Sequence, residues 1–154
     1  MSETTTTTIA AAGTATQARF AAFNADGNAV ALGADDHVIT RDTSTGLEYT
    51  AAGQRGDYLE HEAAMQACTA VTIAGGGWRA PTRAELIAIT DITRQAPAID
   101  AEAFPFVSDD WYWSSDLAAW SSSSAWGVYF NYGGVDGAHR GDDGFALAVR
   151  RAGQ

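Results

Sequence analysis

Apolar and polar positions alternate over short stretches in the first third of the chain, and this pattern predicts strands. Residues 19–23, 29–32 and 37–40 are short runs separated by turn-forming Asn, Asp and Gly. The run Leu47-Glu48-Tyr49-Thr50 alternates strictly, which predicts a strand with one buried and one exposed side.

Helical spacing replaces this alternation in the middle of the chain. Asp57, with Glu60 three residues later, predicts the start of a first helix. Its buried side is expected to hold Leu59, Ala63, Ala67 and Ala70, with Met65 and Cys68 beside them. Cys68 is expected to be a small buried hydrophobe rather than a reactive thiol, because it falls late in the helix, away from a helix N-terminus.

A second helix has a sharper start. Residues 82–85 spell a capping box directly after Pro81, and the expected buried stripe is Leu86, Ile89 and Ile92. The triple glycine at 75–77 lacks the Gly-Lys-Ser/Thr ending of a phosphate-binding loop. We therefore expect it to be a tight connection that leads Trp78 into the core.

The last third is rich in aromatic residues. Four of the five tryptophans fall between Trp111 and Trp126. In the stretch that follows, Trp126, Val128 and Phe130 alternate with Gly127, Tyr129 and Asn131, which predicts a strand with one solvent-facing side. A turn at Gly133-Gly134, a loop rich in Gly and Asp, and a closing strand over 145–149 are expected to complete the fold.

These elements predict an α+β fold, with two helices packed on short antiparallel sheets and a long loop-rich second half. The expected domain spans residues 19–154. Residues 1–18 are Thr- and Ala-rich, and we expect either a flexible tail or an arm that assembles with a neighbouring subunit into a homo-oligomer.

Composition narrows the functional classes. The formal net charge of -10 argues against nucleic-acid binding, because nothing would neutralise phosphates. One cysteine permits no intrachain disulfide and no thiolate metal cluster. The N-terminal residues do not predict a signal peptide, and no apolar run approaches membrane-spanning length.

Catalytic signatures are weak. His37, His61 and His139 do not have the spacing of a metal pair or a catalytic triad. The serine run 121–124 lacks a nucleophile elbow, and the Asp-Asp pairs lack a calcium-loop register. We therefore predict no enzymatic activity, no metal and no cofactor.

Many separated motifs occur in an order that resembles one family. They are residues 45–49, 63–68, 76–86, Asp91, 97–100, Phe104-Pro105, 112–115, Ala125-Trp126, Val128, Phe130 and Val149-Arg150. Over about Val38 to Arg151 the chain resembles Lcl-type C-terminal domains, which are C-type-lectin-fold modules related to the formylglycine-generating enzyme. The resemblance implies a C-type-lectin-like fold, also used by variable proteins of diversity-generating retroelements, including phage tail-tip receptor binders.

The chain also departs from these relatives. Ala148 stands where family members often carry a second cysteine, so Cys68 has no partner. The paired cysteines of the formylglycine-generating enzyme are missing, as is the glutamate-proline-asparagine calcium site of sugar-binding C-type lectins. Both absences argue against those two activities.

The resemblance implies that the residues after the Trp-Ser-Ser motif form a diversified ligand-binding surface on a fixed scaffold. Tyr, Gly, Asn and Asp at the outward positions are the mixture that antibody paratopes use. The expected site residues are Asp116, Leu117, Gly127, Tyr129, Asn131, Tyr132, Gly134, Asp136, Gly137, Ala138, His139, Gly141, Asp142 and Asp143.

The genetic code is consistent with diversification. An AAC codon randomised at both adenines cannot yield Lys, Glu, Gln, Met or Trp, and none of these occurs from Gly127 to Arg150. The expected cassette ends lie near Asp116 and Asp143, with Trp113, Trp126, Val128 and Phe130 fixed in the core. Trp120 falls inside this stretch but is not reachable from Asn, and we assign it to the fixed framework.

Two functional hypotheses follow. The first is a recognition protein that binds a protein or glycan through this surface, as a phage tail tip or an exported bacterial display protein. The second is a structural or oligomerisation component of a phage particle or cell-surface assembly, in which residues 1–18 mediate assembly and the aromatic tail serves only the fold.

Overall fold

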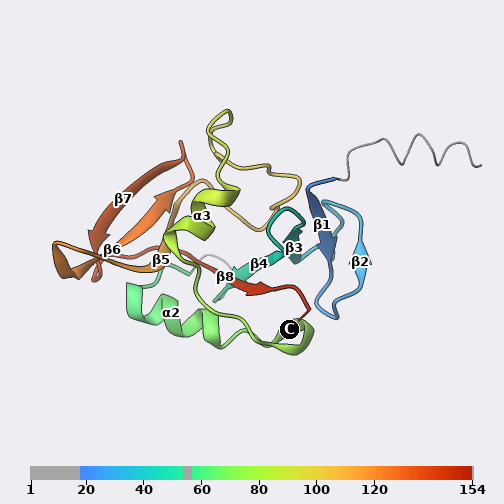
Figure 1. Cartoon of the computed structure of the whole chain (residues 1–154), viewed down its shortest axis with the longest axis horizontal. Coiled ribbons are helices and arrows are strands. Elements are labelled where there is room, and N and C mark those ends of the chain that lie inside the picture. Colours follow the sequence, from blue (N-terminus) through green and yellow to red (C-terminus); the bar gives the residue numbers. More distant parts are fainter. Residues whose placement is uncertain (1–17, 54–56, 154) are drawn as a thin grey trace, which may run out of the picture.

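The computed structural model describes residues 18–53 and 57–153, which form two α-helices and two antiparallel sheets. Figure 1 shows a five-stranded sheet on the right and a three-stranded sheet on the left, with helix α2 along the lower side and helix α3 between the sheets. The α+β prediction is confirmed. The predicted arm lies outside the described residues, apart from Ala18, whose carbonyl accepts a hydrogen bond from Thr43.

The five-stranded sheet has the order β2-β1-β3-β4-β8. Its strands are β1 (Phe20–Phe23), β2 (Ala29–Val30), β3 (Ile39–Asp42), β4 (Leu47–Ala52) and β8 (Ala146–Arg151). The turn after β1 forms as its sequence predicts, because the Asn24 side chain accepts hydrogen bonds from the backbone N–H groups of Asp26 and Asn28, both at 3.0 Å.

Strand β4 was expected to be exposed on one side, and this is wrong. Glu48 and Thr50 are buried as well as Leu47 and Tyr49, because packed elements cover both sides of the sheet. Glu48 is satisfied there by two arginines, Arg41 at 2.8 Å and Arg150 at 2.9 Å. A buried carboxylate is tolerated only with such partners.

Helix α2 (His61–Thr69) begins later than predicted. Leu59 is held in a reciprocal backbone bridge with Gly144, with both N–H···O distances at 2.8 Å, so the helix cannot start at Asp57. The buried stripe is accordingly His61, Ala64 and Cys68. The predicted stripe is wrong at Ala63 and Ala70, which are exposed, whereas Leu59 and Ala67 are half-buried against the core.

Cys68 has the inert, buried character expected of it. Its side chain is fully buried, and burial raises the pKa of the thiol to about 12. A thiol with this pKa is protonated at neutral pH and is a poor nucleophile.

Helix α3 (Arg83–Ile89) confirms the capping box. Glu85 N donates to the Thr82 hydroxyl at 3.2 Å, and Thr82 N donates to the Glu85 carboxylate at 2.8 Å. Leu86 and Ile89 are buried as predicted, but Ile92 is 80% exposed because the helix has ended before it.

The triple glycine leads Trp78 into the core as predicted. Gly75, Gly76 and Gly77 all have positive φ values, 92°, 76° and 84°, which residues with side chains rarely adopt. Trp78 follows as a buried side chain whose Nε1 donates to Ile73 O in the short helix η1 (Ile73–Gly75) at 3.0 Å.

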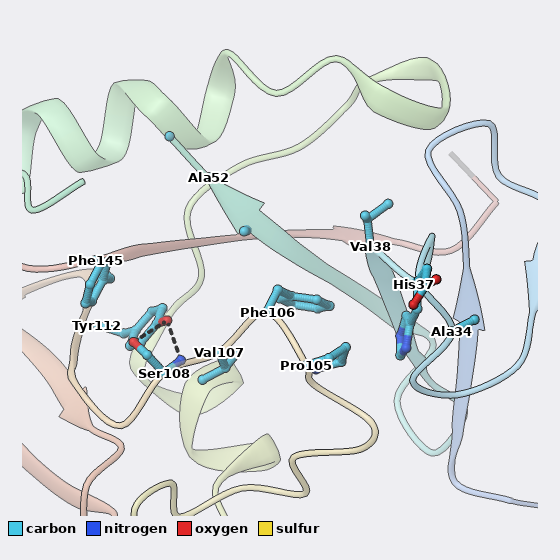
Figure 2. Close-up of a pocket in the computed structure, with 13 residues that line it drawn as sticks. Ala34, His37, Val38, Ala52, Pro105, Phe106, Val107, Ser108, Tyr112 and Phe145 are labelled. Carbon is cyan, nitrogen blue, oxygen red and sulfur yellow. Dashed lines mark hydrogen bonds between the residues drawn. The ribbon is translucent and has the colours of Figure 1, made fainter. Parts of the chain in front are cut away.

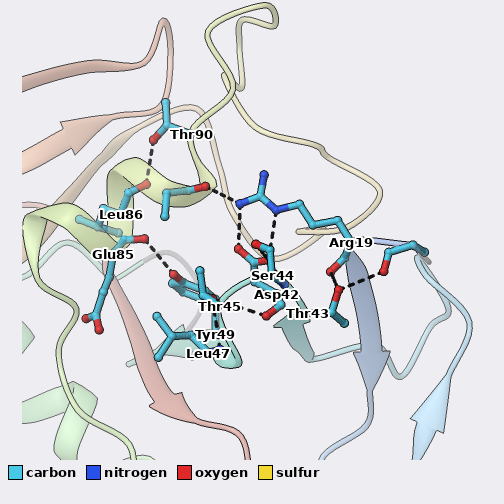
Figure 3. Close-up of polar contacts among 12 residues, drawn as sticks. Arg19, Asp42, Thr43, Ser44, Thr45, Leu47, Tyr49, Glu85, Leu86 and Thr90 are labelled. Atoms are coloured by element: carbon cyan, nitrogen blue, oxygen red, sulfur yellow. Dashed lines mark hydrogen bonds and ion pairs between the residues drawn. The ribbon is translucent and has the colours of Figure 1, made fainter. Parts of the chain in front are cut away.

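A polar network joins the five-stranded sheet to helix α3 (Figure 3). Arg19 binds the buried Asp42 carboxylate with two hydrogen bonds, at 2.8 and 3.1 Å, and also donates to Ala88 O at 2.6 Å. Tyr49 donates to Glu85 O at 2.8 Å. Burial alone would raise the pKa of Asp42, but hydrogen bonds from Arg19 and Ser44 outweigh it and hold the pKa below its usual value.

The three-stranded sheet has the order β5-β6-β7. It consists of β5 (Trp111–Ala118), β6 (Ser121–Tyr129) and β7 (Gly134–His139). The turn at Gly133 is confirmed, with φ 90°, but the expected loop after it is a strand. Main-chain pairing with β6 supports this strand, although Gly and Asp are residue types that strands disfavour. The expected closing strand is confirmed as β8.

Candidate ligand-binding surface

The register of the three-stranded sheet assigns its residues to two sides. Trp113 pairs with Gly127, Gly127 with Asp136, and Tyr129 with Gly134, so all of these face one way. We call this the Tyr129 side. Trp126 pairs with Gly137 and Val128 with Val135 on the opposite side, which we call the Trp126 side. The expected site residues are therefore divided between two surfaces.

The Tyr129 side is only partly open to solvent. Trp113 is fully buried there, with its ring 5.2 Å from that of His61 in α2 and its Nε1 donating to Leu59 O at 3.0 Å. Ala138 is half-buried against the same cluster. The end of this side near α2 is therefore core, as expected for Trp113 but not for Ala138.

Gly127 was expected to face solvent, and this is wrong. Gly127 is buried because the Trp111 indole lies over it, and an added Cβ would overlap both that ring and the Tyr112 carbonyl oxygen. Glycine is the residue this position accommodates, so Gly127 belongs to the scaffold.

Two tyrosines form the open part of the Tyr129 side. Tyr129 is 37% and Tyr132 60% exposed, and their rings meet edge-to-face at 5.4 Å. The Tyr132 ring lies over Gly134, and Asp136 is exposed on the same side of the sheet. Asn131, at the turn, is half-buried, and its carbonyl accepts a hydrogen bond from Ala96 N.

The Trp126 side carries the other aromatic surface. Trp126 was expected in the core but is half-buried, with the Arg83 guanidinium 4.5 Å above its ring. Trp120 is 66% exposed, packs edge-to-face on Trp126 at 5.3 Å and covers Gly137. The sequence reasoning placed both tryptophans in the framework and did not identify this surface.

Residues 140–143 form a turn after β7, which ends at His139. His139, Gly141, Asp142 and Asp143 are exposed, and Gly141 N donates to His139 Nδ1 at 2.9 Å. This end of the sheet also holds the half-buried Asp116 and the exposed Leu117. Asp116 has a structural role, since its carboxylate accepts from Arg83 N at the start of α3 at 2.6 Å.

His61 and Arg140 position this turn, and neither was among the expected site residues. His61 Nε2 lies 2.8 Å from Ser114 O, and because a carbonyl only accepts, Nε2 carries the proton. Nδ1 then accepts from Arg140 Nε at 3.1 Å. Burial lowers the pKa of His61, and the backbone hydrogen bond to Ser114 opposes that shift only partly. A neutral His61 thus anchors Arg140 and the turn that follows.

A cavity of about 530 Å³ lies away from all these residues, between the end of β4 and residues 105–108 (Figure 2). Phe106, Val107, Tyr112 and Phe145 are among its walls. No sequence pattern predicted this cavity, because its walls come from segments distant in the chain.

Within residues 18–53 and 57–153, no group of three or more His, Cys, Asp or Glu side chains is placed to hold a metal ion. In the same part of the chain, no helix is long and apolar enough to cross a membrane.

Comparison with known families identifies the domain. The family described as Lcl C-terminal domain matches residues 38–150, and the chain therefore belongs to this family. A search of curated proteins found no match.

Proposed function

We propose that this protein recognises a ligand through a diversifiable surface displayed on a C-type-lectin-like scaffold, as retroelement variable proteins do. The observation that carries the proposal is the pair of exposed tyrosines, Tyr129 and Tyr132, which stand beside the fully buried Val128 and Phe130. Tyr supplies a large contact area with few rotatable bonds and a hydroxyl for polar contacts.

Packing supports a division between fixed and variable positions. Val128 and Phe130 are fully buried, and Gly127 and Gly144 are close-packed against indole rings. These positions cannot change without cost to the fold. The remaining expected residues with solvent-facing side chains are the proposed variable set: Leu117, Tyr129, Tyr132, Asp136, His139, Asp142 and Asp143.

The ligand is proposed to be a protein or glycan on a target surface, with the protein in a phage tail tip or exported to a bacterial surface. The proposed surface joins the tyrosine pair and Asp136 to Asp142 and Asp143 in the turn that follows β7. Aromatic rings suit stacking on sugar rings or burial in a protein interface, and exposed carboxylates favour partners that offer hydrogen-bond donors.

The test compares the full chain with the triple variant Tyr129→Ala, Tyr132→Ala, Asp136→Ala on arrays of purified glycans and surface proteins. Loss of every array signal with an unchanged melting temperature is expected. A matched control replaces Ile87, Ile92 and Asp26, which are also exposed, with Ala. Equal array signals from wild type and the triple variant would refute this surface as the binding site.

The structural alternative predicts a different result. If the chain is an oligomerisation component, deleting residues 1–18 abolishes assembly in analytical ultracentrifugation, and the triple variant changes nothing. The retroelement part of the proposal has its own test in the flanking DNA. It fails if neither a reverse-transcriptase gene nor an adenine-bearing near-copy of the segment from Asp116 to Asp143 is present.

A further inference from the structure

The cavity beside β4 contains a strand edge that pairs with no other strand among residues 18–53 and 57–153. Ile39 and Thr50 form the last pair between β3 and β4. The next pair would join Val38 to Ala51, but the Val38 carbonyl accepts from the Thr50 hydroxyl at 2.6 Å. Val38 N donates to Phe23 O at 3.1 Å, so the main chain of Val38 is already committed. Strand β4 therefore runs on beyond its neighbour.

Residues Ala51 and Ala52 continue this free edge. On the other side they pair with Leu147 and Ala146 of β8. In a strand the N–H and C=O groups of successive residues point to opposite neighbours. One of these two alanines consequently turns its N–H and C=O away from β8, to the side where β3 has ended.

The surroundings of this edge are apolar. Phe106, Val107, Tyr112 and Phe145 line the cavity, and Figure 2 shows Phe106 and Val107 on the wall opposite β4. The Tyr112 hydroxyl is already occupied, since it lies 3.0 Å from the donor Ser108 N and 3.3 Å from Ser108 Oγ. A volume of about 530 Å³ lies within the usual range of ligand pockets.

Among the described residues that line the cavity, one carries a carboxylate. Asp35 lines the cavity, is exposed, and forms no ion pair with any residue of the described ranges. Neither ring nitrogen of His37 is available to pair with Asp35, because Nδ1 accepts from Gly33 N at 2.9 Å and Nε2 lies 2.8 Å from Thr40 Oγ1. An occupant that complements the cavity therefore carries a cation as well as apolar surface.

We propose that this cavity binds an extended, basic peptide segment of a partner protein, which adds its main chain to the free edge of β4. Main-chain hydrogen bonds to Ala51 or Ala52 hold the segment as an added strand. An apolar side chain of the segment packs against Phe106 and Val107, and a neighbouring Arg or Lys pairs with Asp35. This site is separate from the Tyr129 surface and does not depend on the function proposed for it.

A random heptapeptide library displayed on phage tests the proposal. The library is panned on the full chain and counter-selected on Ala51→Trp, which fills the cavity from an exposed position. Recovered peptides are expected to combine an aromatic or branched aliphatic residue with Arg or Lys within two positions. Synthetic copies should shift the backbone amide signals of Val38, Ala51 and Ala52 in NMR spectra of the full chain.

Variants separate the contributions. Ala51→Trp is expected to weaken binding of the synthetic peptides at least tenfold. Asp35→Asn is expected to weaken it about threefold and to make it less dependent on salt. Ala119→Trp, an exposed alanine in the turn between β5 and β6, is the matched control and should bind like wild type. If Ala51→Trp proves unstable, the peptide affinity of Asp35→Asn and the amide shifts of the full chain decide whether the proposal stands.

Three outcomes overturn the proposal. The first is that no peptide survives counter-selection, and the second is that the survivors lack basic residues or bind Asp35→Asn equally well. The third is that deleting residues 1–17 raises peptide affinity tenfold or more, which would make this chain's own segment the occupant. None of these outcomes bears on the array test of the Tyr129 surface.

Discussion

Replacing Gly127 with alanine should destabilise the domain, although the position lies within the expected binding surface. No positive φ is involved, so the cost comes from space alone. An added Cβ overlaps the Trp111 ring, which could shift, and the Tyr112 carbonyl oxygen, which is fixed by the pairing of β5 with β6. Overpacking costs about 1–3 kcal/mol, and a backbone obstacle places this case near 3 kcal/mol.

Urea unfolding followed by tryptophan fluorescence measures this cost. A loss of about 3 kcal/mol corresponds to a fall in melting temperature of about 6–12 °C for a domain of this size. Gly134→Ala is the matched control, because the three atoms nearest its added Cβ all belong to the exposed Tyr132 side chain, which can rotate away. The control should stay within about 0.5 kcal/mol of wild type.

A double-mutant cycle with Trp111→Leu checks the assigned cause. Removing the indole should relieve part of the Gly127→Ala cost, which gives a coupling above about 0.5 kcal/mol. Strict additivity, or a Gly127→Ala variant as stable as wild type, would refute the reasoning. Gly127 would then return to the displayed set.

Three further predictions concern stability and reactivity. Trp113→Ala should cost about 3–5 kcal/mol in urea unfolding, because a fully buried indole is removed. Burial lowers the pKa of His61 below 6.5, so on acidification the unfolded chain takes up a proton before the native chain does, and stability is lost as the pH falls below 6.5. His61→Gln should flatten this loss in melting curves recorded at several pH values, and an unchanged slope contradicts the assignment. Cys68 should react with a thiol reagent only along the urea unfolding curve, and labelling of the native protein would show that its burial is incomplete.

Features set by local chemistry could be predicted from the sequence. The capping box at Thr82, the Asn24 turn and the glycines before Trp78 each depend on residues a few positions apart. The chain carries those signals whatever its tertiary contacts. These elements could therefore be predicted without knowledge of the fold.

Features set by distant contacts could not be predicted. Helix α2 starts at His61 because Leu59 pairs with Gly144, and nothing near Leu59 in the sequence indicates that pairing. The alternation through β6 correctly placed Val128 inside and Tyr129 outside. It failed at Gly127, because a strand's outer side can be covered by a neighbouring ring such as Trp111.

The two tryptophans of the Trp126 side show a related limit. A tryptophan in an apolar pattern indicates a buried side chain, because tryptophan is highly buried on average. Trp126 and Trp120 instead share a partly open surface with Arg83, which comes from α3. Only the packing of α3 beside β6 places that cation there.

The pairing of β4 with β8 has a consequence for how the chain reaches its native state. Arg150 and Glu48, joined by an ion pair, are 102 positions apart, and most of the domain lies between them. Contacts of such long range make folding slow, because the loop must close before its pairing contributes stability. During synthesis the five-stranded sheet stays incomplete until β8 leaves the ribosome, after every position of the proposed variable segment. Under the proposed function, each new version of that segment spends the translation interval in an unfinished fold, and selection acts on escape from aggregation as well as on binding.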